Sequence, residues 1–392
     1  MDPVSLPLPT EVEVSVVIPC LNEEATVGTC ARKAVSALRK LGTTGEVIVV
    51  DNGSTDRSAD VATAAGARVV REERRGYGQA YLSGFAAARG RFLVMGDADD
   101  TYDFSDLSGF IEPLRQGADM VMGTRIKGRI EPGAMPWHHR WIGVPILTGV
   151  LNALFRAGIS DAHCGLRSIT ADAARGLGLR TTGMEFASEM IIKAARSRLR
   201  IAEVPTTLGI GGRPGKPHLR SFRDGWRHLK MMFMLSPTYL FLVPGGLLFA
   251  VGTALMLATA RGPLVISGVL FDYHWMILGS LCMVLGFNVV SIGFFARIFA
   301  LTEGFEMSDA LLARLFRSLD LERGLIFGTV LALLGLAIDI KILVEWIHKG
   351  FSFGGEVRIR PALVAGTLIV LGVQTVFSSF FYSILGTERR PS

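Results

Sequence analysis

The sequence lacks the patterns that would assign it to several common classes of protein. Its four cysteines, Cys20, Cys30, Cys164 and Cys282, are scattered and form no CxxC pair. They therefore indicate neither a disulfide framework nor a zinc site, and a reducing environment is expected for the soluble part of the chain. No GxGxxG follows the first apolar run, where Pro19-Cys-Leu-Asn-Glu-Glu24 stands instead, and no P-loop pattern occurs. These absences argue against an NAD enzyme and against an ATPase.

Charged residues are also few. They make up 19% of the 392 residues, whereas 49% are hydrophobic, and the mean hydropathy is +0.39. This balance is too apolar for one soluble domain and too charged for a pure membrane bundle, so a soluble domain joined to a membrane domain is expected. The net charge of +6 favours lipid headgroups and phosphates as partners, with no nucleic acid. The N-terminus has no basic stretch followed by an apolar run, so no signal peptide is expected.

Four apolar segments have the length that a membrane span requires, about 20 residues. They are residues 239–260, 274–298, 324–347 and 361–386. The arginines of the loop at 301–323 and of the C-terminal tail favour a cytoplasmic soluble domain at the inner or plasma membrane. Arg358 and Arg360 run against this orientation, since they would then lie outside.

The residues before the spans alternate short apolar runs with helical patterns. The runs are residues 14–18, 47–50, 68–70, 92–95 and 120–122, and helical spacing is clear at 24–40 and 58–65. Apolar runs without polar alternation are typical of strands covered on both faces, so the pattern predicts an α/β domain with a mostly parallel sheet. The predicted soluble domain is residues 1–235, with a basic interfacial segment at 211–235. The predicted membrane domain is residues 236–392.

The most informative pattern is an Asp-x-Asp pair directly after the fourth apolar run. Asp97 and Asp99 follow residues 92–95 after a single glycine. In a parallel sheet, ligands bind at the carboxyl ends of the strands. Two carboxylates at that edge suit Mg²⁺ or Mn²⁺ bridging a diphosphate, because these hard cations take oxygen ligands and leave positions for substrate phosphates. Taken alone, the same pattern also fits a turn with solvated carboxylates.

Three blocks together resemble a known family. Val14–Glu24, Val49–Asp56 and Gly96–Asp99 resemble the nucleotide-sugar half of inverting family 2 glycosyltransferases with a GT-A fold. Asp161–Arg167 resembles a later block of the polyprenyl-phosphate sugar synthases, such as dolichol-phosphate mannose and glucose synthases. The resemblance implies a Rossmann-like GT-A catalytic domain followed by an all-α membrane domain of four transmembrane helices.

The resemblance also implies roles for individual residues. Nucleotide binding falls to Pro19, Asn22, Glu23, Asp51, Gly53, Ser54 and Gly76. The metal is assigned to Asp97 and Asp99, which are named as catalytic together with Arg125 near the phosphates. Acceptor or phosphate binding is assigned to Arg167, Arg213, Lys216, Arg220 and Arg223. Thr101 stands where the synthases often carry glutamine, which leaves the third metal ligand open.

The expected reaction is transfer of a hexose from UDP-glucose or GDP-mannose to undecaprenyl or dolichyl phosphate, with inversion and with Mg²⁺ or Mn²⁺. One alternative is a protein that transports or flips a glycolipid and only binds the nucleotide sugar. Another is a glycosyltransferase acting on a different lipid or on a polysaccharide. Processive synthases carry Gln-x-x-Arg-Trp, and the nearest match, Trp137–Trp141, has Trp in place of the Gln and also fits an amphipathic interfacial turn. The sugar, the isoprenoid length and a homo-oligomeric state stay open.

Three further residues are interpreted as structural or solvated. His163 is expected to pack or to hydrogen-bond with the backbone. Glu185 and Glu189 are four residues apart, so they share one face of a helix; a solvated face is the expectation, and a substrate-facing role is the alternative.

Overall fold

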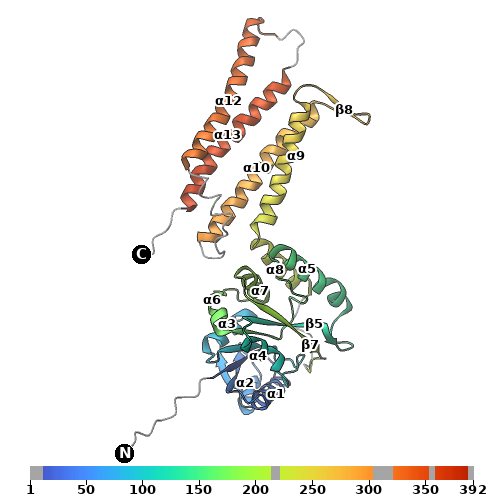
Figure 1. Ribbon diagram of the computed structural model, residues 1–392, viewed down its shortest axis with the longest axis vertical. Coiled ribbons are helices and arrows are strands. Elements are labelled where there is room, and N and C mark those ends of the chain that lie inside the picture. The colour runs from blue at the N-terminus through green and yellow to red at the C-terminus, as the bar shows by residue number, and fades with distance from the viewer. Residues whose placement is uncertain (1–11, 213–220, 303–320, 353–357, 387–392) are drawn as a thin grey trace, which may run out of the picture. The chain divides into compact units, whose positions relative to one another are not determined.

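The computed structural model describes residues 12–212, 221–302, 321–352 and 358–386. Contacts divide the chain into two compact units, Met1–Met232 and Phe233–Ser392. Figure 1 labels the helices and strands of both. The first unit is an α/β domain, and the described part of the second is helical apart from one short hairpin.

A seven-stranded sheet forms the centre of the first unit. Its strands are β1 (Val14–Cys20), β2 (Gly45–Asp51), β3 (Arg68–Arg71), β4 (Phe92–Met95), β5 (Met120–Ile130), β6 (Arg167–Thr170) and β7 (Ile201–Leu208). They lie in the order β3-β2-β1-β4-β6-β5-β7, and all pairs are parallel except those that β6 makes with β4 and β5. The five predicted apolar runs are β1 to β5, and the prediction of a mostly parallel sheet is confirmed. The strands β6 and β7 were not predicted.

The sheet is covered on both faces, which is why its strands read as unbroken apolar runs. On one face Val16 and Ile18 of β1 pack in one cluster with α1 (Val27–Lys40) and α4 (Ser108–Arg115). On the other face lies α3 (Tyr77–Ala87), so close that a Cβ added at Gly84 would lie 2.3 Å from Cγ1 of Val17. Successive strand residues point to opposite faces.

The remaining helices of the first unit flank this core. They are α2 (Ser58–Ala64), the short π-helix η1 (His139–Gly143), α5 (Val144–Phe155), α6 (Ala171–Gly176), α7 (Phe186–Arg196) and α8 (Ser221–Met234), which reaches the end of the unit. Helix α7 packs against α3 through Tyr81 and Phe186, whose rings stack 5.6 Å apart. This contact fixes α7 over the same face of the sheet as α3.

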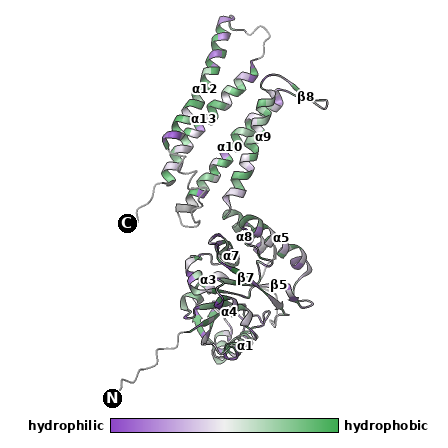
Figure 2. Cartoon of the chain, in the orientation of Figure 1, coloured by the Kyte–Doolittle hydropathy of each residue, from purple (hydrophilic) through white to green (hydrophobic). Residues whose placement is uncertain are grey.

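The described residues of the second unit include four helices long and apolar enough to cross a membrane. These candidate spans are Thr238–Thr259, Tyr273–Ile298, Leu321–His348 and Ile359–Leu385. They correspond to η2 (Thr238–Leu242) with α9 (Val243–Thr259), α10 (Tyr273–Thr302), α12 (Leu321–His348) and α13 (Ile359–Gly386), with a hairpin of β8 (Leu264–Ile266) and β9 (Val269–Phe271) between the first two. Hydrophobic residues dominate along these helices in Figure 2. The prediction of four transmembrane helices is confirmed.

Glycines set the packing of these helices. A Cβ added at Gly252 of α9 would lie 2.5 Å from the carbonyl oxygen of Gly279 of α10. A Cβ at Gly372 of α13 would lie 2.6 Å from the carbonyl oxygen of Gly328 of α12. Small residues allow such close approach of membrane helices, whose association depends on van der Waals packing.

Candidate active site

Three residues predicted to bind the nucleotide meet where β1 and β2 end. The parallel register pairs Cys20 with Asp51, so the loops after both strands share one edge of the sheet. The backbone N–H of Ser54 donates to Oδ1 of Asp51 at 3.0 Å, and the backbone N–H of Asn22 donates to Oγ of Ser54 at 3.0 Å. Asn22 has a left-handed φ of 55°, which asparagine tolerates better than most residues. The structure thus joins Asn22, Asp51 and Ser54 into one network.

Glu23 belongs to the framework of this edge. Its side chain is 5% exposed and accepts a hydrogen bond from Oγ1 of Thr26 at 3.2 Å, while its backbone N–H donates to Oγ of Ser58 at 2.8 Å. Pro19 is the penultimate residue of β1, and Gly53 turns the chain with a φ of 84°. Nucleotide binding by these three residues stays a prediction.

Gly76 is held at the same edge by Asn52. The amide nitrogen of Asn52 donates to the carbonyl oxygens of Glu72 and Arg74 at 3.1 and 2.8 Å, and its amide oxygen accepts from the N–H of Gly76 at 2.7 Å. A Cβ at Gly76 would lie 2.3 Å from the carbonyl oxygen of Thr182. Asn52 therefore clamps the loop that leads into α3, and Gly76 is required there by close backbone approach.

Asp97 and Asp99 follow β4 at this edge, and both are partly buried. Oδ1 of Asp97 accepts a hydrogen bond from the hydroxyl of Tyr77 at 3.0 Å. Oδ1 of Asp99 accepts from the backbone N–H and the hydroxyl of Thr101, at 3.1 and 2.6 Å. Thr101 thus orients Asp99. Burial, followed by the neighbouring carboxylate of Asp99, raises the pKa of Asp97 above its usual value.

This donor set fits a divalent cation. Two carboxylates close enough to raise the pKa of one of them are stabilised by a shared positive charge. Within the described residues there is no group of three or more histidine, cysteine or acidic side chains that could hold a metal by itself. Mg²⁺ is commonly bound by one or two carboxylates together with water and substrate phosphates, so the pair suffices once a diphosphate is present.

Two buried arginines, Arg125 and Arg167, bring positive charge to Asp97, and this charge opposes the rise in its pKa that burial and Asp99 cause. Nε and Nη2 of Arg125 donate to the two oxygens of Asp161 at 2.7 and 2.8 Å. Arg167 is 2% exposed and donates to the carbonyl oxygens of Cys164 and Ala187. Backbone carbonyl oxygens thus hold the guanidinium of Arg167 in place, and its positive charge near Asp97 is a feature of the fold. Its predicted contact with the sugar acceptor stays a prediction.

The comparisons with known proteins decide the family. Residues 15–177 match "Glycosyl transferase family 2", and residues 294–386 match "Glycosyltransferase family 2 C-terminal transmembrane region". The low-salt glycan biosynthesis hexosyltransferase Agl6 of Haloferax volcanii is 40% identical over 376 residues, which cover 95% of this chain and 89% of the relative. The chain belongs to glycosyltransferase family 2. It is a hexosyltransferase and an integral membrane protein, and the predicted GT-A fold of its first unit is confirmed.

Other relatives cover a little over half of the chain. The dolichyl-phosphate hexose transferase of Haloferax volcanii is 30% identical over 214 residues, which are 54% of this chain and 89% of that protein. Glucosyl-3-phosphoglycerate synthase from Mycobacterium tuberculosis, solved with Mn²⁺, UDP and glucosyl-3-phosphoglycerate, is similar with a TM-score of 0.45 and 23% identity, covering 56% of this chain and 78% of that chain.

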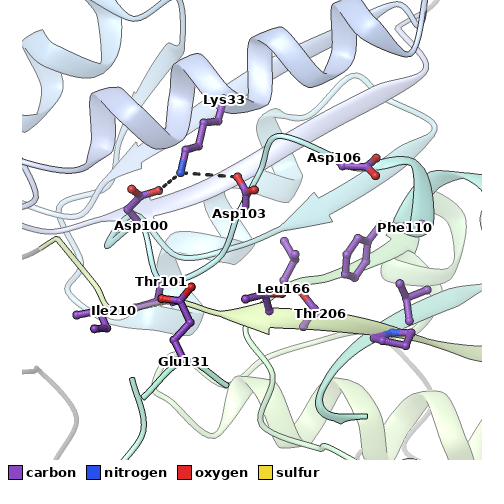
Figure 3. A pocket seen from close by; sticks show the side chains of 15 residues that line it. Lys33, Asp100, Thr101, Asp103, Asp106, Phe110, Glu131, Leu166, Thr206 and Ile210 are labelled. Carbon is purple, nitrogen blue, oxygen red and sulfur yellow. Dashed lines mark hydrogen bonds and ion pairs between the residues drawn. The ribbon is translucent and has the colours of Figure 1, made fainter. Parts of the chain in front are cut away.

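A cavity of about 560 Å³ lies next to the Asp-x-Asp turn of this glycosyltransferase. Asp100, which has a left-handed φ of 59°, lines it, and Lys33 of α1 binds Asp100 at 2.8 Å and Asp103 at 3.7 Å (Figure 3). The opposite wall is formed by Glu131 and by residues 204–207 of β7. Asp100 is therefore tied to α1 by Lys33, which separates its role from that of Asp97 and Asp99.

Five residues are predicted to bind the acceptor or its phosphate. Arg213, Lys216 and Arg220 lie outside the described residues. Arg223 is exposed on α8, and its Nε lies 3.8 Å from Oδ1 of Asp224. The acceptor role of these residues stays a prediction.

Sequence reasoning missed several residues that support the site. Tyr77 donates to Asp97, and Asp161 accepts from Arg125. In the sequence, the only signal for either residue is its nearness to a motif. Tyr77 follows Gly76, and Asp161 begins the Asp161–Arg167 block. The expectation of a solvated face for Glu189 is wrong: it is 2% exposed, pairs with Lys193 at 2.7 Å and accepts from Thr181. The chain folds back over this helix, which spacing alone does not reveal.

His163 lies beside a second histidine. Its ring is 4.7 Å from that of His228, and both its ring nitrogens are buried with no hydrogen-bond partner among the described residues. Burial, followed by His228, keeps the pKa of His163 well below its usual value. A neutral packed ring agrees with the expectation of packing, although no backbone hydrogen bond to the ring is made.

Proposed function

We propose that this hexosyltransferase moves a hexose from a nucleotide sugar, UDP-glucose or GDP-mannose, to a polyprenyl phosphate at the cytoplasmic face of the membrane, with inversion and with a divalent cation. The observation that carries the proposal is the Asp97–Asp99 pair at the end of β4, at one sheet edge with Asp51 and Asn22, in a chain that also has four candidate spans. A relative named dolichyl-phosphate hexose transferase supports the choice of acceptor.

The donor would bind along the edge formed by the ends of β1, β2 and β4. Asn22, Asp51 and Ser54 lie where the nucleoside is expected, and Asp97 and Asp99 would hold Mg²⁺ or Mn²⁺ on the diphosphate. The cation, when bound, supplies positive charge to the departing nucleotide. Tyr77 and Thr101 keep the two carboxylates in place by donating to one oxygen of each.

A phosphate acceptor of this kind needs no general base to activate it. A phosphomonoester has a second pKa near 6, so a lipid phosphate is already ionised near neutral pH. The protein then has to bring two anionic reactants together and orient them, for which cationic side chains are suited. Arg125 is one such group, held rigid by Asp161, and the basic segment before the first span is the other.

The test is transfer of radiolabelled hexose from a panel of nucleotide sugars to short polyprenyl phosphates, with and without Mg²⁺. Asp99→Asn should lower the rate at least about 100-fold, which corresponds to roughly 2.7 kcal/mol of lost transition-state stabilisation. The matched control is Asp60→Asn, which removes one exposed carboxylate from α2 and should leave the rate unchanged. If Asp99→Asn keeps more than half of the wild-type rate, the proposed metal site is wrong.

A further inference from the structure

The candidate spans of the second unit carry an internal sequence repeat. Helices α10 and α13 share seven residues at a constant spacing of 86. These are Val284, Leu285, Gly286, Val290, Phe294, Phe295 and Ile298, which recur as Val370, Leu371, Gly372, Val376, Phe380, Phe381 and Ile384. Helices α9 and α12 share glycines at a spacing of 83, Gly245 with Gly328 and Gly252 with Gly335. We call α9 with α10 the first helix pair and α12 with α13 the second helix pair (Figure 1).

The two helix pairs also pack through the same atoms. A Cβ added at Gly245 would lie 3.0 Å from the carbonyl oxygen of Gly286 and 2.9 Å from the backbone nitrogen four residues further along α10. A Cβ added at Gly328 would lie 2.7 Å from the carbonyl oxygen of Gly372 and 2.9 Å from the backbone nitrogen four residues further along α13. Gly372 is the counterpart of Gly286, so equivalent residues make the same contact in each pair. The two pairs are therefore repeats of one structural unit.

The helix pairs contact each other through α10 and α13, but with different sides of these two helices. If a two-fold axis related the pairs, counterparts would be about equally buried. Instead Leu371 of α13 is 4% exposed, whereas its counterpart Leu285 of α10 is 53% exposed. The reverse holds for another side of the helices, since Ile298 of α10 is 4% exposed and its counterpart Ile384 is 68% exposed. The pairs therefore stack head to tail.

Head-to-tail stacking leaves two faces uncovered. The α10 face consists of exposed residues of α10, namely Leu278, Leu281, Leu285, Asn288 and Ile292. The α13 face consists of exposed residues of α13, namely Val370, Val373, Phe377, Phe380 and Ile384. In both cases the counterparts on the other helix, 86 residues away, are buried or half-buried. Each face thus repeats one half of the interface between α10 and α13, so the two faces are complementary to each other.

A polar side chain indicates that protein, not lipid, covers the α10 face. Asn288 is exposed and lies near the middle of the candidate span Tyr273–Ile298. The amide oxygen of its counterpart, Gln374, is buried. Amides at this depth of a membrane protein face other helices, because hydrocarbon offers them no hydrogen-bond partner. The one surface known to cover such a face is the side of α10 that the α13 face repeats, so a second copy of the chain is the fitting occupant.

We propose that copies of this chain associate in the membrane by placing the α10 face of one copy on the α13 face of the next, so that the stacking of helix pairs continues from chain to chain. On α10 the exposed Leu285 and the buried Ser291 are six residues apart, which is about 120° round the helix. A turn of this size at each helix curves the stack, so that a small number of copies closes a ring. The proposal involves neither donor nor acceptor and can fail without affecting the proposed function.

The contact inside the chain predicts which residues meet between copies. The hydroxyls of Ser280 and Thr367 are hydrogen-bonded at 2.6 Å, and the counterparts of these residues are Gly366 and Leu281. Leu281 of one copy should therefore lie beside Gly366 of the next. Both positions accept a cysteine, since Leu281 is 61% exposed and a Cβ at Gly366 would have no described atom within 4 Å.

The test joins two differently tagged full-length chains in lipid vesicles, one with Leu281→Cys and the other with Gly366→Cys. Both carry Cys282→Ser, because this native thiol lies in a span and is only half-buried. A copper phenanthroline oxidant is added, and the mixed disulfide is measured by its two tags. Chains with Cys282→Ser and no added cysteine give the background from the three buried thiols of the first unit.

The matched control places the second cysteine on another lipid-exposed helix, as Leu333→Cys. Leu333 is 56% exposed on α12 and lies at a similar depth to Gly366, since a Cβ at Gly335 would lie 2.6 Å from the carbonyl oxygen of Ala365. The mixed disulfide between positions 281 and 366 should form several-fold faster than that between 281 and 333. The difference should persist as the vesicles are diluted with lipid, because random collisions decline on dilution.

A further variant asks whether the α10 face itself is responsible. Leu285→Trp should slow the reaction between positions 281 and 366 to the rate of the control, because its counterpart Leu371 is 4% exposed and leaves no room for a larger ring. Leu333→Trp should leave that reaction unchanged. Equal rates for positions 366 and 333 would overturn the proposal. So would a disulfide between two chains with Leu281→Cys that forms faster than the mixed one, since α10 faces would then meet each other.

Discussion

The buried pair of Arg125 and Asp161 gives the most quantitative prediction. Asp161 is 0% exposed and Arg125 is 9% exposed. The carboxylate accepts from Nε and Nη2 of Arg125 and from the backbone N–H groups of Arg125 and His163. Asp161→Asn preserves the shape of the side chain but leaves the guanidinium without a counter-charge. Removing one partner of a buried pair destabilises a protein by about 3–5 kcal/mol, and we expect about 3 kcal/mol because the amide oxygen can still accept.

The first unit, Met1–Met232, is of a size for which 1 kcal/mol shifts Tm by roughly 2–4 °C. Asp161→Asn should therefore lower the apparent Tm by about 6–12 °C. The measurement follows a thiol-specific dye, since Cys20, Cys30 and Cys164 are buried and react when this unit unfolds. Heating at one fixed rate is essential, because irreversible unfolding makes Tm depend on the rate.

The matched control is an exposed pair. Asp172 binds Arg175 with side chains that are 89% and 75% exposed, and such pairs contribute about 0–1 kcal/mol. Asp172→Asn should shift Tm by less than about 4 °C. The double variant Arg125→Met with Asp161→Leu removes both charges and should recover most of the stability, while transfer should be lost because the guanidinium of Arg125 is absent. Equal shifts for Asp161→Asn and Asp172→Asn would refute the reasoning.

Two further predictions concern the stability of the first unit. Glu189→Gln should cost about 2 kcal/mol at pH 7 in urea unfolding. Burial alone would raise the pKa of Glu189, but hydrogen bonds from Lys193 and Thr181 hold it below its usual value. The difference from wild type should therefore persist above about pH 4.3 and shrink as the pH falls below it, and an equal difference at about pH 3.5 would contradict this. Gly78→Ala should destabilise by about 1–3 kcal/mol, because its Cβ would lie 2.3 Å from the carbonyl oxygen of Thr181. Gly176→Ala is the control and should not destabilise the unit, because no atom lies within 4 Å of the Cβ it would add. Similar urea midpoints for Gly78→Ala and Gly176→Ala would exclude the contact with Thr181 as the cause.

The strands that the sequence predicts are those whose side chains are apolar on both faces. In β1 six of the seven residues are buried, and the run of hydrophobic letters follows from that. The strand β6 begins with Arg167 and Ser168, and Ser168 finds its hydrogen-bond partner far away in the sequence: its Oγ donates to the carbonyl oxygen of Phe110 at 2.7 Å. No local pattern contains that partner, so this strand is found only in the folded chain.

The same argument separates the predictable part of the site from the rest. Asp51, Asp97 and Asp99 follow apolar runs, and parallel strands bring their carboxyl ends to one edge, so their meeting follows from the sequence. Tyr77 reaches Asp97 from α3, whose placement depends on the close approach of Gly84 to Val17. Glu189 is buried because the segment of Arg180 and Thr181 covers it. Such partners are set by tertiary packing, which motif and periodicity do not encode.

The antiparallel strand explains how the distant Asp161–Arg167 block enters the site. A parallel strand contributes its last residues to the carboxyl edge of the sheet, whereas an antiparallel strand contributes its first. The register pairs Arg167, the first residue of β6, with Met95, the last residue of β4. The loop that precedes β6 must therefore arrive beside Asp97, carrying Asp161 to Arg125, while Met122 of β5 pairs with the same Arg167. The reversed direction of β6 thus places Arg167, and Asp161 as the partner of Arg125, next to the proposed metal site, and a parallel β6 would have sent that block to the opposite edge.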